Sequence, residues 1–261
     1  NTGLRSEDLD FWNMYGGRNE GEVIEESPSP SPSPSEEPSP SPTPTEDPAY
    51  EDVQKNSIDF TKIKIVNDQM GYYPAGEKTS RLGVELSKNN GKVDFDWLKR
   101  NGIDFVMLKV GGRGYESGVI SLDEQFTDYM EAAKKADLDI GVTFYSQAVS
   151  VTEAVDEANF VINQLQSYTI RYPVALVMEE ITNDTARTDT LSVDQRSRIA
   201  EAFLQTIRYD GYHAILYGNE QWLSEKIRPV GLLTDYYVLL NDTAPLPEYP
   251  YEFKMWRYAT D

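Results

Sequence analysis

The sequence predicts an α/β fold, an irregular TIM-like (β/α) barrel with fewer helices in its last third, preceded by a disordered Ser/Pro-rich stalk. From residue 81 onward, short apolar runs alternate with amphipathic segments of helical period, and this order is typical of a parallel sheet. The number of runs favours a barrel over an open sheet. The last runs lack long helical segments between them, which makes the barrel irregular there.

The stalk is predicted for residues 1–57. Serine and proline alternate from Ser27 to Ser35 and again up to Pro44. Alternating prolines fix φ and remove N–H donors, so the segment favours extended polyproline II over a packed form. The first 57 residues also hold 13 acids and 3 bases. We interpret them as a linker between an anchor and a domain; a ligand for a proline-binding module is the alternative.

Residues 58–261 are predicted to form one domain. The expected strands are residues 81–86, 105–110, 140–145, 174–178, 213–217, 236–240 and 253–258. The expected helices are residues 95–100, 122–136, 151–165 and 221–226, with a further helix that Ser192 caps and that runs to Tyr209. Ser192 and Gln195 have the spacing of a capping box, which defines where that helix begins.

An open, doubly wound sheet is the main structural alternative. Such sheets bind nucleotides through a glycine-rich turn after the first strand, and here that turn reads Ser87-Lys88-Asn89-Asn90-Gly91. The later run Gly111-Gly112-Arg113-Gly114 lacks the Lys-Ser/Thr pair of a phosphate-binding loop. We interpret that run as a tight turn, and we expect no nucleotide ligand.

Composition excludes several other classes of protein. The chain has no cysteine, one histidine and a net charge of −20, which excludes a disulfide scaffold and a thiolate metal site and argues against a histidine-dependent nucleophile. The acidic balance disfavours nucleic acid as a partner. No apolar stretch approaches the roughly 18 residues that span a bilayer. We therefore expect any membrane anchor to lie outside this chain, which does not begin with methionine.

Two carboxylates follow apolar strands and are the candidate catalytic residues. Glu179 follows the apolar run 174–178, and Glu85 lies near the end of the run 81–86. Strand ends of a parallel barrel carry its chemistry, and glycoside hydrolysis needs one acid and one carboxylate at the same site. The alternative for each residue alone is a strand-end carboxylate bonded to backbone N–H groups. Val177 stands two residues before Glu179, where a second acid would point into the same site.

Aromatic side chains are predicted at the same strand ends. They are Tyr145, Tyr217, Trp256 and Tyr258. Aromatic faces stack on the apolar faces of sugar rings, and phenol groups hydrogen-bond sugar hydroxyls. Packing in the core is the alternative, because aromatic residues bury large areas in any barrel. Four at strand ends favour a carbohydrate ligand.

Residues 81–261 resemble glycoside hydrolase family 25, the N-acetylmuramidase (lysozyme) family. The matching segments are Gly83–Ser87, Gly91–Trp97, Gly102–Val106, Gly111–Tyr115, Gly141–Ala148, Tyr172–Glu180, Tyr217–Asn219 and Met255–Tyr258. The resemblance implies an irregular barrel that cleaves the bond between N-acetylmuramic acid and N-acetylglucosamine in peptidoglycan, with no metal and no cofactor. It also implies that Glu179 is the general acid and that Gln147, within one matching segment, lies at the substrate site.

The chain departs from the family pattern at the candidate site. Val177 replaces the Asp of an Asp-x-Glu strand end, Glu85 replaces an Asp, and Asn241 ends a strand that usually reads Trp-Leu-Ala-x-Tyr. Apolar surroundings should raise the pKa of Glu179. Two hypotheses follow: a muramidase that uses Glu179 and Glu85, or a catalytically impaired relative that serves as a cell-surface glycan-binding or interaction module. Either is expected as a monomer on peptidoglycan, outside a bacterial cell and tethered to its envelope.

Overall fold

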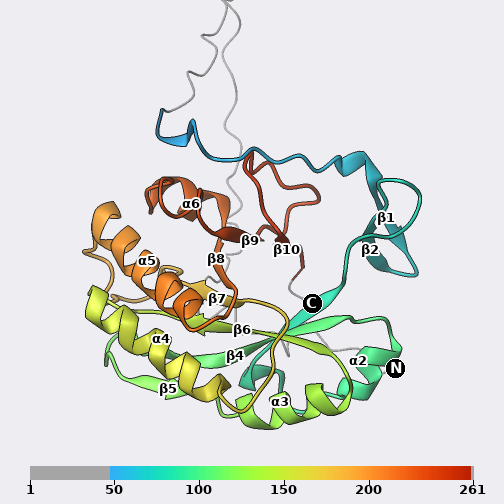
Figure 1. Ribbon diagram of the computed structural model, residues 1–261, viewed down its shortest axis with the longest axis horizontal. Coiled ribbons are helices and arrows are strands. Elements are labelled where there is room, and N and C mark those ends of the chain that lie inside the picture. The colour runs from blue at the N-terminus through green and yellow to red at the C-terminus, as the bar shows by residue number, and fades with distance from the viewer. Residues whose placement is uncertain (1–47, 260–261) are drawn as a thin grey trace, which may run out of the picture.

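The computed structural model describes residues 48–259 and shows an α/β fold built on one curled sheet (Figure 1). Seven parallel strands lie in the order β10-β9-β8-β7-β6-β4-β3, and a short strand, β5, pairs antiparallel with β4. Their bounds are β3 (Gly83–Leu86), β4 (Phe105–Arg113), β5 (Ile120–Leu122), β6 (Asp139–Tyr145), β7 (Val174–Val177), β8 (Ala214–Gly218), β9 (Tyr237–Asn241) and β10 (Met255–Arg257). The predicted parallel α/β sheet is confirmed.

Helices cover the outer face of this sheet. They are α2 (Phe95–Arg100), α3 (Phe126–Lys135), α4 (Val151–Leu165), α5 (Val193–Tyr209) and α6 (Glu220–Glu225), and three short 3-10 turns are η2 (Pro48–Tyr50), η3 (Phe60–Lys62) and η4 (Lys88–Asn90). Ser192 and Gln195 form the predicted capping box at the start of α5. The large apolar core lies between the helices and the outer face of the sheet. No helix within residues 48–259 is long and apolar enough to cross a bilayer.

A second, smaller cluster fills the concave side of the sheet. It consists of Met107, Tyr145, Ala175, Val177, Ile215, Tyr217 and Leu239. Along β7 the residues alternate: Leu176 faces the helices, whereas Ala175 and Val177 face the interior, as the period of two in a strand requires. Every second side chain of these strands therefore points into the interior of the curled sheet.

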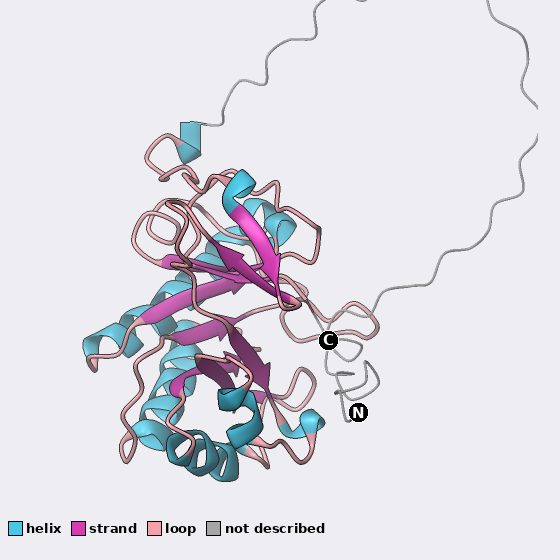
Figure 2. Cartoon of the chain, turned by 90° about the vertical axis from the view of Figure 1, so that its right-hand side faces the viewer, coloured by secondary structure: helices cyan, strands magenta, loops and turns pink. Residues whose placement is uncertain are grey.

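The sheet curls without closing (Figure 2). β3 and β10 are its two edges and share no backbone ladder, so the sheet is a curled half-barrel with an open seam, and the closed form of the predicted barrel is absent from residues 48–259. The segment between β9 and β10 holds no helix. The seam is where the candidate site and a neighbouring cavity are found.

The predicted tight turn at 111–114 is wrong in its first part. Gly111 and Gly112 belong to β4 and pair with Leu122 and Ser121 of β5. A Cβ on Gly111 would lie 2.1 Å from the carbonyl oxygen of Ser121, and one on Gly112 would lie 2.8 Å from that of Tyr145. Glycine is needed here because three strands approach closely. The helix predicted from residue 122 begins at 126, since Leu122 lies in β5.

The first described residues pack on the domain, although residues 1–57 were assigned to the stalk. Val53 is buried, Lys55 forms a β-bridge with Tyr251, and Tyr50 stacks on Tyr251 at 4.8 Å between ring centroids. A hairpin that the sequence analysis did not anticipate follows, formed by β1 (Ile63–Val66) and β2 (Gln69–Tyr72). The Ser-Pro repeat lies outside the described residues.

Candidate active site

Glu179 lies two residues beyond the end of β7, at the open end of the sheet interior. The side-chain amide of Asn241 donates a hydrogen bond to Glu179 Oε1 at 3.1 Å. Glu179 Oε2 is buried and has no hydrogen-bond partner within residues 48–259. Burial raises the pKa of Glu179 to about 7; the Asn241 hydrogen bond opposes this rise, and the negative charge of Glu85 adds to it.

Glu85 lies on β3, across the seam from β10. The hydroxyl of Tyr145 donates to Glu85 Oε1 at 3.1 Å, and Arg257 Nε lies 3.6 Å from Glu85 Oε2. Burial raises the pKa of Glu85, while Arg257 and the Tyr145 hydrogen bond oppose the rise. The structure therefore brings both predicted carboxylates into one electrostatically coupled site.

Asn241 and Arg257 connect the two carboxylates. They end the neighbouring strands β9 and β10 and stand opposite each other in the ladder. Arg257 Nη1 donates to Asn241 Oδ1 at 3.0 Å. Because a guanidinium can only donate, the oxygen of the Asn241 amide must face Arg257, and its nitrogen must face Glu179.

Lys109 adds a second cation to the site. It lies on β4 with its ammonium 4.3 Å from the centroid of the Tyr145 ring. Burial lowers its pKa to about 8, although Asp123 and Glu85 favour the charged form. Its signal in the sequence is a single lysine within the apolar strand 105–110.

Tyr145 and Tyr217 belong to the interior cluster, with exposures of 5% and 0%. Burial, together with the carboxylates nearby, raises both phenol pKa values well above the ordinary value. Both phenols therefore stay protonated, and Tyr145 acts as the hydrogen-bond donor to Glu85. With their rings packed in the core, these two residues offer no open face for a sugar ring.

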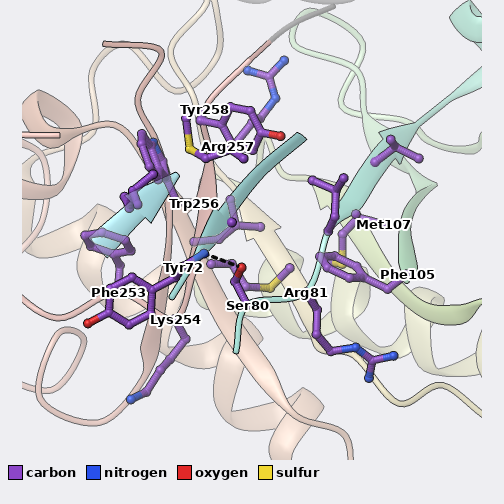
Figure 3. A pocket seen from close by; sticks show the side chains of 18 of the residues that line it. Tyr72, Ser80, Arg81, Phe105, Met107, Phe253, Lys254, Trp256, Arg257 and Tyr258 are labelled. Carbon is purple, nitrogen blue, oxygen red and sulfur yellow. Dashed lines mark hydrogen bonds between the residues drawn. The ribbon is translucent and has the colours of Figure 1, made fainter. Parts of the chain in front are cut away.

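Trp256 and Tyr258 lie at the seam and line a cavity of about 430 Å³ together with Glu85 and Arg257 (Figure 3). Their ring centroids are 5.6 Å apart, and the Trp256 indole donates to the carbonyl of Asp242 at 2.7 Å. Both rings are partly exposed. Of the four predicted aromatics, these two have the accessibility that stacking on a ligand requires.

Gln147 is held behind the site. Its side-chain oxygen accepts a hydrogen bond from Thr188 at 2.9 Å, and its nitrogen lies 3.5 Å from the carbonyl oxygen of Glu179. It is 5% exposed, so in this structure it supports the backbone at Glu179. Glu180 points away from the interior and pairs with Lys226 at 3.0 Å.

The comparisons with known proteins identify the family and the fold. A family model described as "Glycosyl hydrolases family 25" matches residues 84–260, from β3 to beyond β10. The chain belongs to glycosyl hydrolase family 25. The hairpin β1–β2 and the segment that leads to β3 precede the family 25 match.

Solved structures give the same fold at low sequence identity. The modular autolysin LytC from Streptococcus pneumoniae has 17% identity and a TM-score of 0.58, covering 76% of this chain and 48% of the autolysin. A family 25 glycosyl hydrolase from Bacillus anthracis has 14% identity and a TM-score of 0.55, covering 69% and 79%. A muramidase from Trichobolus zukalii has 18% identity and a TM-score of 0.54, covering 69% and 87%.

The chain spans about half the length of the S. pneumoniae autolysin. A search of curated protein sequences finds no match.

Within residues 48–259, no group of three or more His, Cys, Asp or Glu side chains could hold a metal ion. Around the open end of the sheet the domain places acids, an amide, phenols and two cations.

Proposed function

We propose that this family 25 domain hydrolyses the bond between N-acetylmuramic acid and N-acetylglucosamine in peptidoglycan. Glu179 acts as the general acid that protonates the leaving oxygen. Glu85 acts as the carboxylate that stabilises positive charge on the sugar or activates water. The proposal extends to the setting: the domain works as a monomer on cell-wall glycan outside a bacterium, tethered through the acidic Ser/Pro-rich segment.

The state of Glu179 is the observation that carries this proposal. A general acid must hold a proton at the working pH, and burial raises the pKa of this carboxyl to about 7. Asn241 occupies Oε1, and the buried Oε2 has no partner within residues 48–259. A proton on Oε2 is thus directed at no other group within residues 48–259.

The comparisons support peptidoglycan as the substrate class. One solved structure is of the S. pneumoniae autolysin LytC in complex with a synthetic peptidoglycan ligand, with 17% identity and a TM-score of 0.57 to this chain. That protein is longer than the present chain and shares its family 25 fold. The accessible aromatic rings of Trp256 and Tyr258 beside Glu85 add a surface suited to sugar rings.

The test is release of new reducing ends from purified peptidoglycan by the full chain. Glu179→Gln keeps the size and the Asn241 contact but removes the acid, and it should lower turnover by orders of magnitude. Glu180→Gln is the matched control, because that neighbouring carboxylate is paired with Lys226 outside the interior. If the wild-type chain releases no reducing ends, or if Glu179→Gln is as active as wild type, the proposal fails.

Glycan binding without turnover is the second candidate function. Val177 supports it, because this 1% exposed side chain fills the interior position where a second acid would stand. Arg257 also neutralises part of the charge on Glu85. On this alternative, peptidoglycan pull-down should survive Glu179→Gln and decrease with Trp256→Ala. Failure of the full chain to bind peptidoglycan at all would exclude it.

A further inference from the structure

Arg257 lies between the two candidate catalytic carboxylates. It pairs with Glu85, and it hydrogen-bonds Asn241, which in turn donates to Glu179. We infer that Arg257 is a positioning residue that joins Glu85 and Glu179 into one unit, Glu85 directly and Glu179 through Asn241, and that by favouring a charged Glu85 it gives the two carboxyl groups opposite protonation states. This inference rests on the proposed function. Because Val177 stands in place of an acid, Glu85 and Glu179 are the two carboxyl groups that must divide the roles of base and acid.

The guanidinium is fixed by the fold. Arg257 ends β10, and its carbonyl accepts a hydrogen bond from the backbone N–H of Asp242 at 3.1 Å. The preceding Trp256 donates to the carbonyl of the same Asp242. The side chain of Arg257 is only 12% exposed. Its position is therefore set by the ladder with β9 and by burial, and it does not depend on a bound ligand.

The direct contact favours a charged Glu85. Arg257 Nε lies 3.6 Å from Glu85 Oε2, while Tyr145 donates to Oε1. Both oxygens thus face positive or donor groups, and Lys109 adds a further positive charge. An opposite charge at this range favours ionisation of a carboxyl group by about 1–3 pH units. Burial raises the pKa of Glu85, but these groups all oppose the rise, and on this ground we assign Glu85 as the carboxylate of the pair.

The charge that Arg257 favours on Glu85 in turn favours a protonated Glu179. Burial and the negative charge of Glu85 raise the pKa of Glu179, and they act against the Asn241 hydrogen bond and the charge of Arg257, which lower it. Arg257 holds Asn241 with its amide nitrogen toward Glu179 Oε1, so one oxygen accepts a hydrogen bond and the other can keep the proton. No cation contacts Glu179 directly among the ion pairs of residues 48–259. The charged Glu85 disfavours a second negative charge nearby. The proton of the pair therefore resides on Glu179.

Three other titratable groups lie near Glu85 and Glu179 and interact with their charges. Lys109 on β4, Tyr145 on β6 and Tyr217 on β8 all interact electrostatically with the carboxylates. The two phenols do not titrate below pH 10, because burial raises their pKa values. Lys109 has a pKa of about 8 and should change the titration of Glu85 only in the alkaline range.

Arg257 also bridges the open seam between β3 and β10, so a purely structural role must be distinguished from the inferred one. Site-resolved titration makes this distinction without any need for turnover. We suggest following the side-chain carboxyl carbons of Glu85 and Glu179 by NMR in the full chain, as wild type, Arg257→Gln and Arg257→Lys. Arg198→Gln is the control, since Arg198 is an exposed arginine of α5 paired with Asp194.

In the wild type, Glu85 should lose its proton at lower pH than Glu179. Arg257→Gln should raise the midpoint of Glu85 by about 1–3 units, whereas Arg257→Lys, which keeps the charge but not the planar fork, should leave it near the wild-type value. A folded Arg257→Gln chain with an unchanged Glu85 midpoint overturns the inference. If that variant does not fold, the wild-type order decides: Glu179 ionising before Glu85 overturns it equally.

Turnover provides a second readout. Arg257→Gln should move the acidic limb of the rate profile upward together with the Glu85 midpoint, and Arg257→Lys should restore it. If the wild-type chain does not cleave peptidoglycan, the proposed function fails, while the titration still decides on Arg257. If cleavage is found and the acidic limb stays in place in Arg257→Gln, the proposed function stands and the inference about Arg257 fails.

Discussion

Val177 and Glu179 lie on the same side of the β7 backbone, one an apolar residue sealed in the sheet interior and the other an acid at its mouth. Val177 is 1% exposed and packs in the interior cluster with Tyr145 and Tyr217. The charge of Glu179 acts on the same two tyrosines. The strand therefore supplies one carboxyl group to the site, and the second must come from β3, on the far edge of the sheet.

Replacing Glu179 by Gln should stabilise the domain above pH 7. In the unfolded chain this carboxyl loses its proton near pH 4.5, whereas in the folded chain it holds it to about pH 7. Folded stability therefore falls as pH rises through this window and is constant above it. Denaturant unfolding should show Glu179→Gln to be about 2–3 kcal/mol more stable at pH 8 and equal to wild type at pH 4. Equal stability at both values would contradict the raised pKa.

The rate of peptidoglycan cleavage should depend on pH as a narrow bell. Activity needs a protonated Glu179 and an ionised Glu85, so the alkaline limb should fall near pH 7 and the acidic limb above pH 4.5, because burial raises the pKa of Glu85. The measurement is kcat/KM against pH on soluble glycan fragments. The two limbs belong to the coupled pair, and a flat profile from pH 4 to 9 would contradict this assignment.

Val177→Asp should increase turnover and decrease stability. The substitution places an acid at the interior position where the family pattern has one, so we expect a gain in reducing ends if the rest of the site is competent. A carboxyl group inside an apolar cluster costs about 2–5 kcal/mol, which chemical unfolding at pH 7 can measure. Val177→Asn is the matched control, with similar size and no charge. A gain with Asn as large as that with Asp would show that charge is not the cause.

Arg113 should be essential for stability and not for chemistry. It follows the two glycines of β4 and pairs with Glu157 at 2.7 Å, and both side chains are buried. It also donates to the carbonyls of Gly118 and Glu153. Removing one member of a buried pair costs about 3–5 kcal/mol, so Arg113→Met should lose about this much at pH 8.

The loss should be smaller at pH 6. Burial raises the pKa of Glu157 to about 7, and without Arg113 the carboxyl can become neutral by taking up a proton. Arg198→Met is the comparison, because its partner Asp194 and the arginine itself are exposed, and such pairs contribute less than about 1 kcal/mol. A loss for Arg113→Met no larger than that for Arg198→Met would contradict the role of the buried pair.

Glu179 and Glu85 could be placed together from the sequence because Glu179 follows one apolar run and Glu85 lies near the end of another, and the strand ends of a parallel barrel face one mouth. The meeting of Asn241 and Arg257 beside them could not be predicted, since it depends on the register between β9 and β10 and on the curl that brings β3 toward β10. The same holds for Gln147, whose partner Thr188 lies in a loop 41 residues away.

Gly111 and Gly112 show a different kind of error. A run of glycines predicts a turn when positive φ is the reason for them, but neither residue has positive φ in this structure. They are small because β5, β4 and β6 pass close together. Sequence alone does not distinguish these two reasons, since the crowding comes from strands that are distant along the chain.

At the seam between β3 and β10, side chains take the place of a backbone ladder. Strands joined by a ladder hold a fixed spacing of about 4.8 Å, whereas the two edges here meet through the side chains of Glu85 and Arg257. An ion pair therefore joins the two edges of the sheet at the candidate site, and this pair lies outside the backbone hydrogen bonds that order the other strands.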